Sequence, residues 1–224
     1  MADRIIQTET LQGIANALRG GASQSLADKI EVADFAEVAE ELKADSNTLK
    51  GVIERTSTSV TIPKGTTSIG TNAFYKYTSL ASITISEGVT SIGNDAFYGC
   101  TSLTEVNLPS SLTSIGSGAF FVCTSLASIT IPERVTSIAA GAFNGCTSLA
   151  SITIPEGVTS IGNSAFSGCT SLASITIPEG VTSIGSGAFS RINADAVINC
   201  GFSEGAVSGA PWGAPNTVTI NYDV

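Results

Sequence analysis

Four regularly spaced cysteines are the strongest candidates for metal ligands in this 224-residue chain. They recur every 23 residues, at Cys100, Cys123, Cys146 and Cys169. A structural zinc site needs four ligands that converge on one point, whereas one thiol per 23 residues predicts a line of sulfur atoms. Tyr77 and Ile192 take the equivalent places in the flanking units, which favours an apolar slot. We expect buried free thiols, with no metal and no cofactor.

A row of carboxylates has the same period, and it could bind Ca²⁺ or hydrolyse a glycosidic bond. Its members are Glu87, Glu133, Glu156 and Glu179, with Lys64 and Ser110 at the remaining places. Ca²⁺ needs six or more oxygen ligands, and a glycosidase needs an acid and a base in different environments. A solvated edge fits this regular row better. The chain also has no His, which excludes His-dependent nucleophilic and general-base catalysis, so we expect no enzyme.

Charge and hydropathy limit the classes of partner. The 19 acidic and 10 basic side chains give a net charge of −9, which disfavours nucleic acid because phosphate binding needs clustered Lys and Arg. No segment approaches the ~20 apolar residues of a membrane span, and residues 1–8 lack the apolar run of a secretory signal. We expect synthesis in the cytoplasm and no membrane insertion.

A 23-residue repeat must position all of these residues. Six units run from 60–82 to 175–197, each with one Phe at the same place: Phe74, Phe97, Phe120, Phe143, Phe166 and Phe189. One unit offers about seven buried side chains at ~1.5–3 kcal/mol each, which does not offset the ~1–2 kcal/mol per residue of ordering 23 residues. The units must therefore stack, and the sequence predicts a β-rich solenoid of 23-residue coils with a parallel sheet, rising ~5 Å per coil.

Two exposed rows are candidate binding surfaces. A polar row alternates with inward Ile residues and faces solvent: Thr84, Asn107, Thr130, Thr153 and Thr176. Such a row can bind sugar hydroxyls, but β-branched Thr also suits a strand surface without any ligand, and we favour this second reading. The position after each Phe is aromatic in the first three units (Tyr75, Tyr98, Phe121) and small or polar afterwards.

These three aromatic residues form a stripe with their neighbours Lys76, Tyr77 and Val122 at the same corner. An idealised repeat needs no large aromatic side chain there, so the stripe is a candidate contact with a partner or a second copy. The alternative, which we favour slightly, is that the N-terminal segment of the same chain covers it.

The ends depart from the repeat. Residues 1–50 show apolar residues at helical spacing and predict a small helical leader: Leu11, Ile14, Leu18, Phe35, Val38 and Leu42. Two short helices cannot build a core of their own. We therefore expect residues 1–50 to pack on the first coil, on sister chains in a homo-oligomer, or on a larger particle. Residues 51–197 form the repeat domain and residues 198–224 a C-terminal cap. Trp212 either closes that end or stacks on a sugar, and we favour closure.

The repeated phrase L-x-x-I-x-I-P-x-x-V-x-S-I-G-x-x-A-F-x-G-C resembles the BspA-type leucine-rich repeat. That resemblance implies adhesion or binding by cell-surface proteins, without a catalytic motif. The leader phrase T-x-T-L-x-x-I-A-x-A-L-R resembles phage and prophage tail-associated proteins of Gram-positive gut bacteria. The leader implies a tail-fibre or receptor-binding component located in the virion, whose partner is a virion protein, a host-surface protein or a glycan. The alternatives are a bacterial cell-surface adhesin and a virion decoration protein without a receptor.

Overall fold

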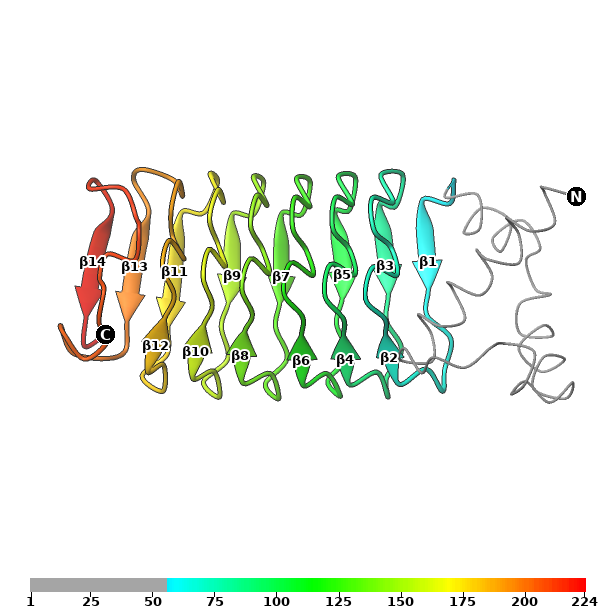
Figure 1. Ribbon diagram of the computed structural model, residues 1–224, viewed down its shortest axis with the longest axis horizontal. Helices are drawn as coiled ribbons and strands as arrows, with labels where there is room; N and C mark the ends of the chain where they lie inside the picture. The colour runs from blue at the N-terminus through cyan, green and yellow to red at the C-terminus, as the bar shows by residue number, and fades with distance from the viewer. Residues whose placement is uncertain (1–55) are drawn as a thin grey trace, which may run out of the picture.

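The computed structural model describes residues 56–224, which form one elongated row of coils (Figure 1). Each coil contributes one strand to a parallel stack: β1 (Ser59–Thr61), β3 (Ser82–Thr84), β5 (Glu105–Asn107), β7 (Ser128–Thr130), β9 (Ser151–Thr153), β11 (Ser174–Ile177), β13 (Val197–Cys200) and β14 (Thr219–Tyr222). Where strands pair, residue 59 lies opposite residue 82 and residue 174 opposite residue 197, so the register equals the repeat period. In the last pair of strands Val197 lies opposite Thr219, so the register there is one residue less than the repeat period. The predicted solenoid is confirmed, with about seven turns.

A second stack of two-residue strands runs along another side of the coils. Its members are β2 (Ser68–Ile69), β4 (Ser91–Ile92), β6 (Ser114–Ile115), β8 (Ser137–Ile138), β10 (Ser160–Ile161) and β12 (Ser183–Ile184). The Thr before four of these strands adds hydrogen bonds to the preceding coil. Thr113, for example, donates from N and from Oγ1 to the Thr90 carbonyl, both at 2.9 Å. The sequence did not predict this second sheet, because two residues are too few to show a strand period.

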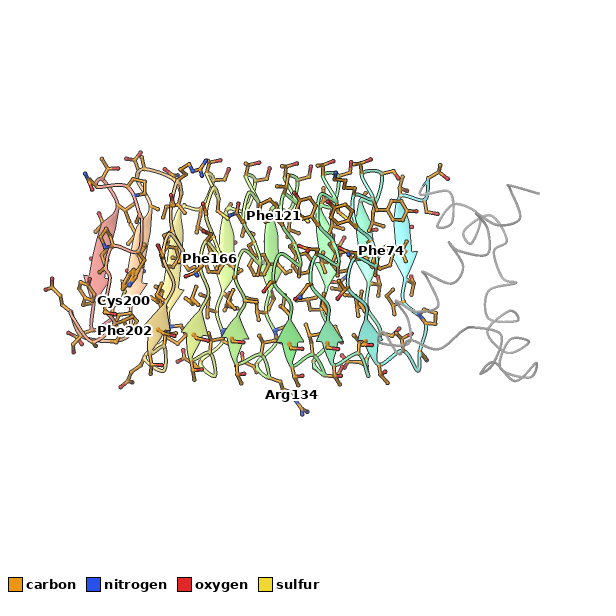
Figure 2. The ribbon with its side chains drawn as sticks, viewed as in Figure 1. Phe74, Phe121, Arg134, Phe166, Cys200 and Phe202 are labelled. Atoms are coloured by element: carbon orange, nitrogen blue, oxygen red, sulfur yellow. The ribbon has the colours of Figure 1, made fainter. Side chains whose placement is uncertain are left out.

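The Phe ladder fills the core. Five of its six rings are fully buried, and successive rings stack nearly parallel with centroids 5.1–5.7 Å apart. The backbone links the same coils, since Phe97 N donates to the Ala119 carbonyl (2.8 Å) and Phe120 N to the Ala142 carbonyl (2.8 Å). Figure 2 shows Phe74 and Phe166 inside the row. The spacing matches the expected rise of ~5 Å per coil.

The thiols are free and buried, as predicted, and the four of the repeat take part in hydrogen bonding within the core. Cys123 Sγ donates to the Phe97 carbonyl (3.2 Å), and Cys146 and Cys169 repeat the contact one and two coils later. Burial holds the pKa of the Cys123 and Cys146 thiols well above the usual value and raises that of Cys169 to about 12. These thiols are therefore protonated donors rather than nucleophiles.

Trp212 closes the C-terminal end of the Phe ladder, 23 residues after Phe189. Its side chain is 3% exposed, and its ring lies edge-on to Phe189 and to Phe202, with centroids 6.2 Å away in both cases. Phe189 N donates to the Trp212 carbonyl (3.2 Å), and Trp212 Nε1 donates to the Ser208 carbonyl (2.9 Å). Trp212 is therefore both the next member of the Phe series and its terminal lid, which leaves no free ring face for a sugar.

The predicted leader lies outside the described residues. This applies to both expected helices and to all of their contact residues: Leu11, Ile14, Leu18, Phe35, Val38 and Leu42. Within residues 56–224, no helix has the length and apolar character needed to cross a bilayer.

Candidate functional site

The aromatic stripe is a second stack of rings, outside the Phe ladder, which we call the aromatic ladder (Tyr75, Tyr98 and Phe121). Tyr75 and Tyr98 stack with centroids 4.8 Å apart, and Tyr98 and Phe121 with centroids 4.9 Å apart. The Lys76 ammonium lies 5.4 Å from the centroid of the Tyr75 ring, within cation–π range. All three rings are half-buried. The structure thus brings together residues that the sequence separates by 23 positions.

This stacking limits what the aromatic ladder can bind. Both faces of Tyr98 are covered by its neighbours, and the outer side of Phe121 approaches Gly141, where an added Cβ would lie 3.6 Å from Phe121 Cδ2. Ring edges remain at the surface, so a sugar cannot stack on Tyr98. A contact with a partner through these edges remains a prediction.

Tyr77 and Val122, which the sequence placed beside the aromatic ladder, differ from its three rings in burial or in backbone conformation. Tyr77 is 2% exposed and stacks on Phe74 with centroids 6.2 Å apart, so it belongs to the core and not to a surface. Its side chain replaces Cys in the first coil and points inward as Cys does. Val122 has φ +57°, and Gly99 and Gly145 hold positive φ at the equivalent places of adjacent coils. A β-branched residue in this region is strained by ~1–2 kcal/mol, a feature that concentrates at functional sites.

The polar sheet face has the expected orientation. Thr84, Asn107, Thr130, Thr153 and Thr176 are all exposed on successive strands, each next to a buried Ile or Val. Asn107 departs from the Thr row, and its Nδ2 donates to Glu105 Oε1 (3.2 Å) on the same strand. Whether this face binds a ligand stays a prediction.

Among the described residues, Glu87 is the member of the carboxylate row whose side chain is hydrogen-bonded to the following coil. It accepts from Ser110 N (3.0 Å), Ser110 Oγ (3.1 Å) and Ser111 N (3.3 Å). These hydrogen bonds, with that from Ser110 N the strongest, keep the pKa of the Glu87 carboxyl below its ordinary value. Residues 56–224 contain no group of three or more carboxylates and thiols placed to hold a metal ion.

The stack of coils opens at one junction. Strands β5 and β7 are not paired, nor are β6 and β8, and the ribbons of both pairs stand visibly apart (Figure 1). Among the described residues, no hydrogen bond joins Thr136 to Thr113 or Ala139 to Ile115, whereas the equivalent bonds exist between the neighbouring coils. The Phe side of the same two coils stays closed, because Gly118 N and Val122 N still donate to the next coil at 2.9 and 2.7 Å. Strands β9 and β11 are also unpaired, but there β10 and β12 remain paired.

A hollow of about 580 Å³ lies over the open junction. Its polar lining includes Thr104, Glu105, Asn107, Ser110, Ser128, Thr130 and Glu133. Three of these are departures from the repeat: Glu105 replaces Ser, Asn107 replaces Thr, and Ser110 replaces Glu. In the sequence, Asn107 and Ser110 belong to the separate polar and carboxylate rows, and Glu105 was not singled out. All three departures lie on or just after β5 and border one hollow, a coincidence that alignment of the six units shows.

Six copies of a family model, the BspA type leucine-rich repeat region, match residues 54–149 and 136–200. The chain belongs to the BspA-type leucine-rich repeat family. No curated protein matches the chain.

Solved structures of leucine-rich proteins resemble the chain in fold. The chain is 45% identical to a leucine rich cell surface protein from Faecalibacterium prausnitzii, with a TM-score of 0.60 over 64% of this chain. It is 31% identical to a leucine-rich repeat protein of T. pallidum, with a TM-score of 0.60, covering 74% of this chain and 73% of the other. A leucine-rich repeat protein from Bacteroides ovatus is 27% identical, with a TM-score of 0.57, covering 75% of this chain and 52% of the other. The chain spans 38% of the length of the F. prausnitzii protein.

Proposed function

We propose that this BspA-type chain is a non-enzymatic binding protein of a bacterial cell surface, whose repeat domain attaches to a protein or glycan outside the cell. The observation that carries the proposal is the 45% identity to a protein described as a leucine rich cell surface protein. The stack of coils, with buried free thiols and no metal-binding group of side chains among residues 56–224, suits a scaffold for binding.

These comparisons support the cell-surface alternative better than the virion reading. The leader that suggested a phage tail lies before residue 54, where the family match begins. The resemblance of residues 1–50 to tail-associated proteins therefore stays a prediction, and the proposal does not depend on it.

Location is tested on the source bacterium with antibodies against residues 56–224. We expect labelling of intact cells, with a cytoplasmic marker labelled only after permeabilisation. Labelling confined to lysed cells, or to sedimenting particles in the culture medium, would contradict a cell-surface role. The particle result would restore the virion reading.

Binding is tested with the purified full chain on a glycan array and a panel of extracellular host proteins. The aromatic ladder is tested with Tyr98→Ser, because Ser stands at the equivalent place in Ser167 and Ser190 and therefore fits the coil. Thr153→Ser on the polar sheet face is the matched control. A hit that weakens in the first variant alone assigns the contact to the aromatic ladder, and a hit that Tyr98→Ser leaves unchanged excludes the aromatic ladder.

A further inference from the structure

The open junction has a cause in the sequence. The residue after the Ile of the second stack is Gly in five of the six coils. A Cβ there would collide with the coil before it. An added Cβ would lie 2.5 Å from a backbone nitrogen at Gly93, 2.6 Å at Gly116, 2.5 Å at Gly162 and 2.4 Å at Gly185. The fourth coil has Ala139 at this position, and it is the coil that lacks the hydrogen bonds of Thr136 N and Ala139 N to its predecessor.

Ala139 acts as a wedge between the third and fourth coils. Its methyl group needs room that the tight stack does not provide, and a contact with backbone cannot be relieved by rotating a side chain. The Phe side remains hydrogen-bonded, so the coils separate at the two strand sides, β5 from β7 and β6 from β8. What is unique to this junction is that both strand sides are open, and Ala139 is the one departure from Gly at this position.

The lining of this hollow presents acceptors and negative charge. Glu105 and Glu133 supply two carboxylates, Asn107 an amide oxygen, and Ser110 and Thr130 hydroxyl groups. No basic side chain lines it. Arg134 adjoins Glu133 in sequence, but it points outward from its turn (Figure 2), and no ion pair joins it to a carboxylate within residues 56–224.

The width of the junction restricts the ligand further. Inserting a peptide strand between β5 and β7 needs Cα atoms about 9.5 Å apart, twice the usual strand spacing, yet Cα atoms of these strands approach within 8 Å. A ligand must therefore dock on the face. A lysine or arginine side chain suits it, because the charged end donates to the carboxylates while the apolar stem lies against half-buried Leu108 and Pro132.

We infer that the hollow between β5 and β7 binds a lysine or arginine side chain of a protein partner, and that Ala139 holds the hollow open. This binding site rests on the proposed binding function, for which it supplies the class of partner and the place on the repeat domain. Residues 56–224 hold nine acidic and four basic side chains, so the surrounding charge also favours a cationic partner.

The test uses the full-length protein, isotopically labelled, and the probe acetyl-Lys-Ser-Lys-Ser-Lys-amide. We expect amide shifts confined to residues lining the hollow and no shifts with the same peptide acetylated on every lysine. Glu105→Ser with Asn107→Thr restores the residues of neighbouring coils, and this double variant should weaken Kd at least about fivefold, as loss of a charge-assisted hydrogen bond does. Glu156→Ser removes the same charge two coils from Ser110 and should leave Kd unchanged.

The role of Ala139 is tested with Ala139→Gly, which restores the residue of the other coils. Hydrogen exchange at Thr136 and at residue 139 should slow to the rates of Thr159 and Gly162, and the Kd for the lysine peptide should weaken at least about fivefold. The inference is overturned if Ala139→Gly binds as the parent does, if Glu156→Ser loses as much affinity as the double variant, or if the acetylated peptide binds equally well. Any of these results leaves the surface location and the array results standing, so failure of this site is separable from failure of the proposed function.

Discussion

At the residue scale, the turn after each Phe shows how backbone conformation selects amino acids. Gly168 has φ +76°, and an added Cβ there would lie 3.5 Å from Gly145 Cα, an ordinary contact. Substitution is therefore limited by φ and not by space. Lys76, Val122 and Arg191 accept the same conformation in other coils, each at some cost.

Gly168→Ala should lower the free energy of unfolding by about 1 kcal/mol, measured by urea denaturation. Gly168→Asn should cost less although Asn is larger, because Asn adopts the left-handed conformation more readily. If the loss instead grows with side-chain size, space rather than φ controls this position.

Glu87 connects a single carboxylate to the pH dependence of stability. Its pKa is lower in the folded chain than in the unfolded chain, so the carboxylate stabilises the fold above its unfolded pKa of about 4.5, and this stabilisation is lost as pH falls through the folded pKa. Urea denaturation at pH 7 and at pH 3 should therefore show a smaller pH effect for Glu87→Gln than for the parent protein. Glu156→Gln is the matched control at the same place in another coil, and an equal flattening there would show that general charge repulsion is responsible.

At the scale of elements, Trp212 shows how a solenoid ends. The terminal coil must shield the ring of Phe189 and cannot use another identical coil to do so. Trp212 occupies the Phe position 23 residues on, and contacts both Phe189 and Phe202. The wider indole covers the end, while the strand stack continues to β14.

Trp212→Ala should destabilise the protein by about 3–5 kcal/mol, the range for removing a large buried aromatic side chain. Trp212→Phe restores the ladder residue and should retain most of the stability, which urea denaturation followed by circular dichroism measures. Because the chain has a single Trp, blue-shifted fluorescence should report its burial in the parent. Equal losses in both variants would place the stabilising interaction at the indole Nε1 and the Ser208 carbonyl rather than in the ring contacts.

At the scale of the whole molecule, residues 1–50 are predicted to assemble copies of the chain. Light scattering should give a closed oligomer for the full chain and a monomer for a truncation that starts at residue 51, since apolar stripes on two short helices need a partner surface. Hydrodynamic size of the truncation should still fit an elongated monomer. If both proteins are monomers, the leader packs on its own chain or on a different partner, and multivalent attachment is excluded.

The sequence by itself determined the period, the stacked coils, the line of buried thiols and the alternation of Thr and Ile. Each of these follows from a local pattern repeated at a fixed interval, so equivalent residues must stack. Closure of the C-terminal end by Trp212 was also predicted from the sequence, and the residue continues the period of Phe74 to Phe189.

Tertiary structure alone decided where the stack opens and which surface residues meet. The mutual covering of Tyr75, Tyr98 and Phe121 depends on ring orientation, which spacing does not specify. The separation of β5 from β7 depends on a contact between Ala139 and backbone about 22 residues earlier in the chain. A substitution of Gly by Ala looks conservative along the sequence, and it has a consequence only because the backbone of the preceding coil lies too close to accept a methyl group.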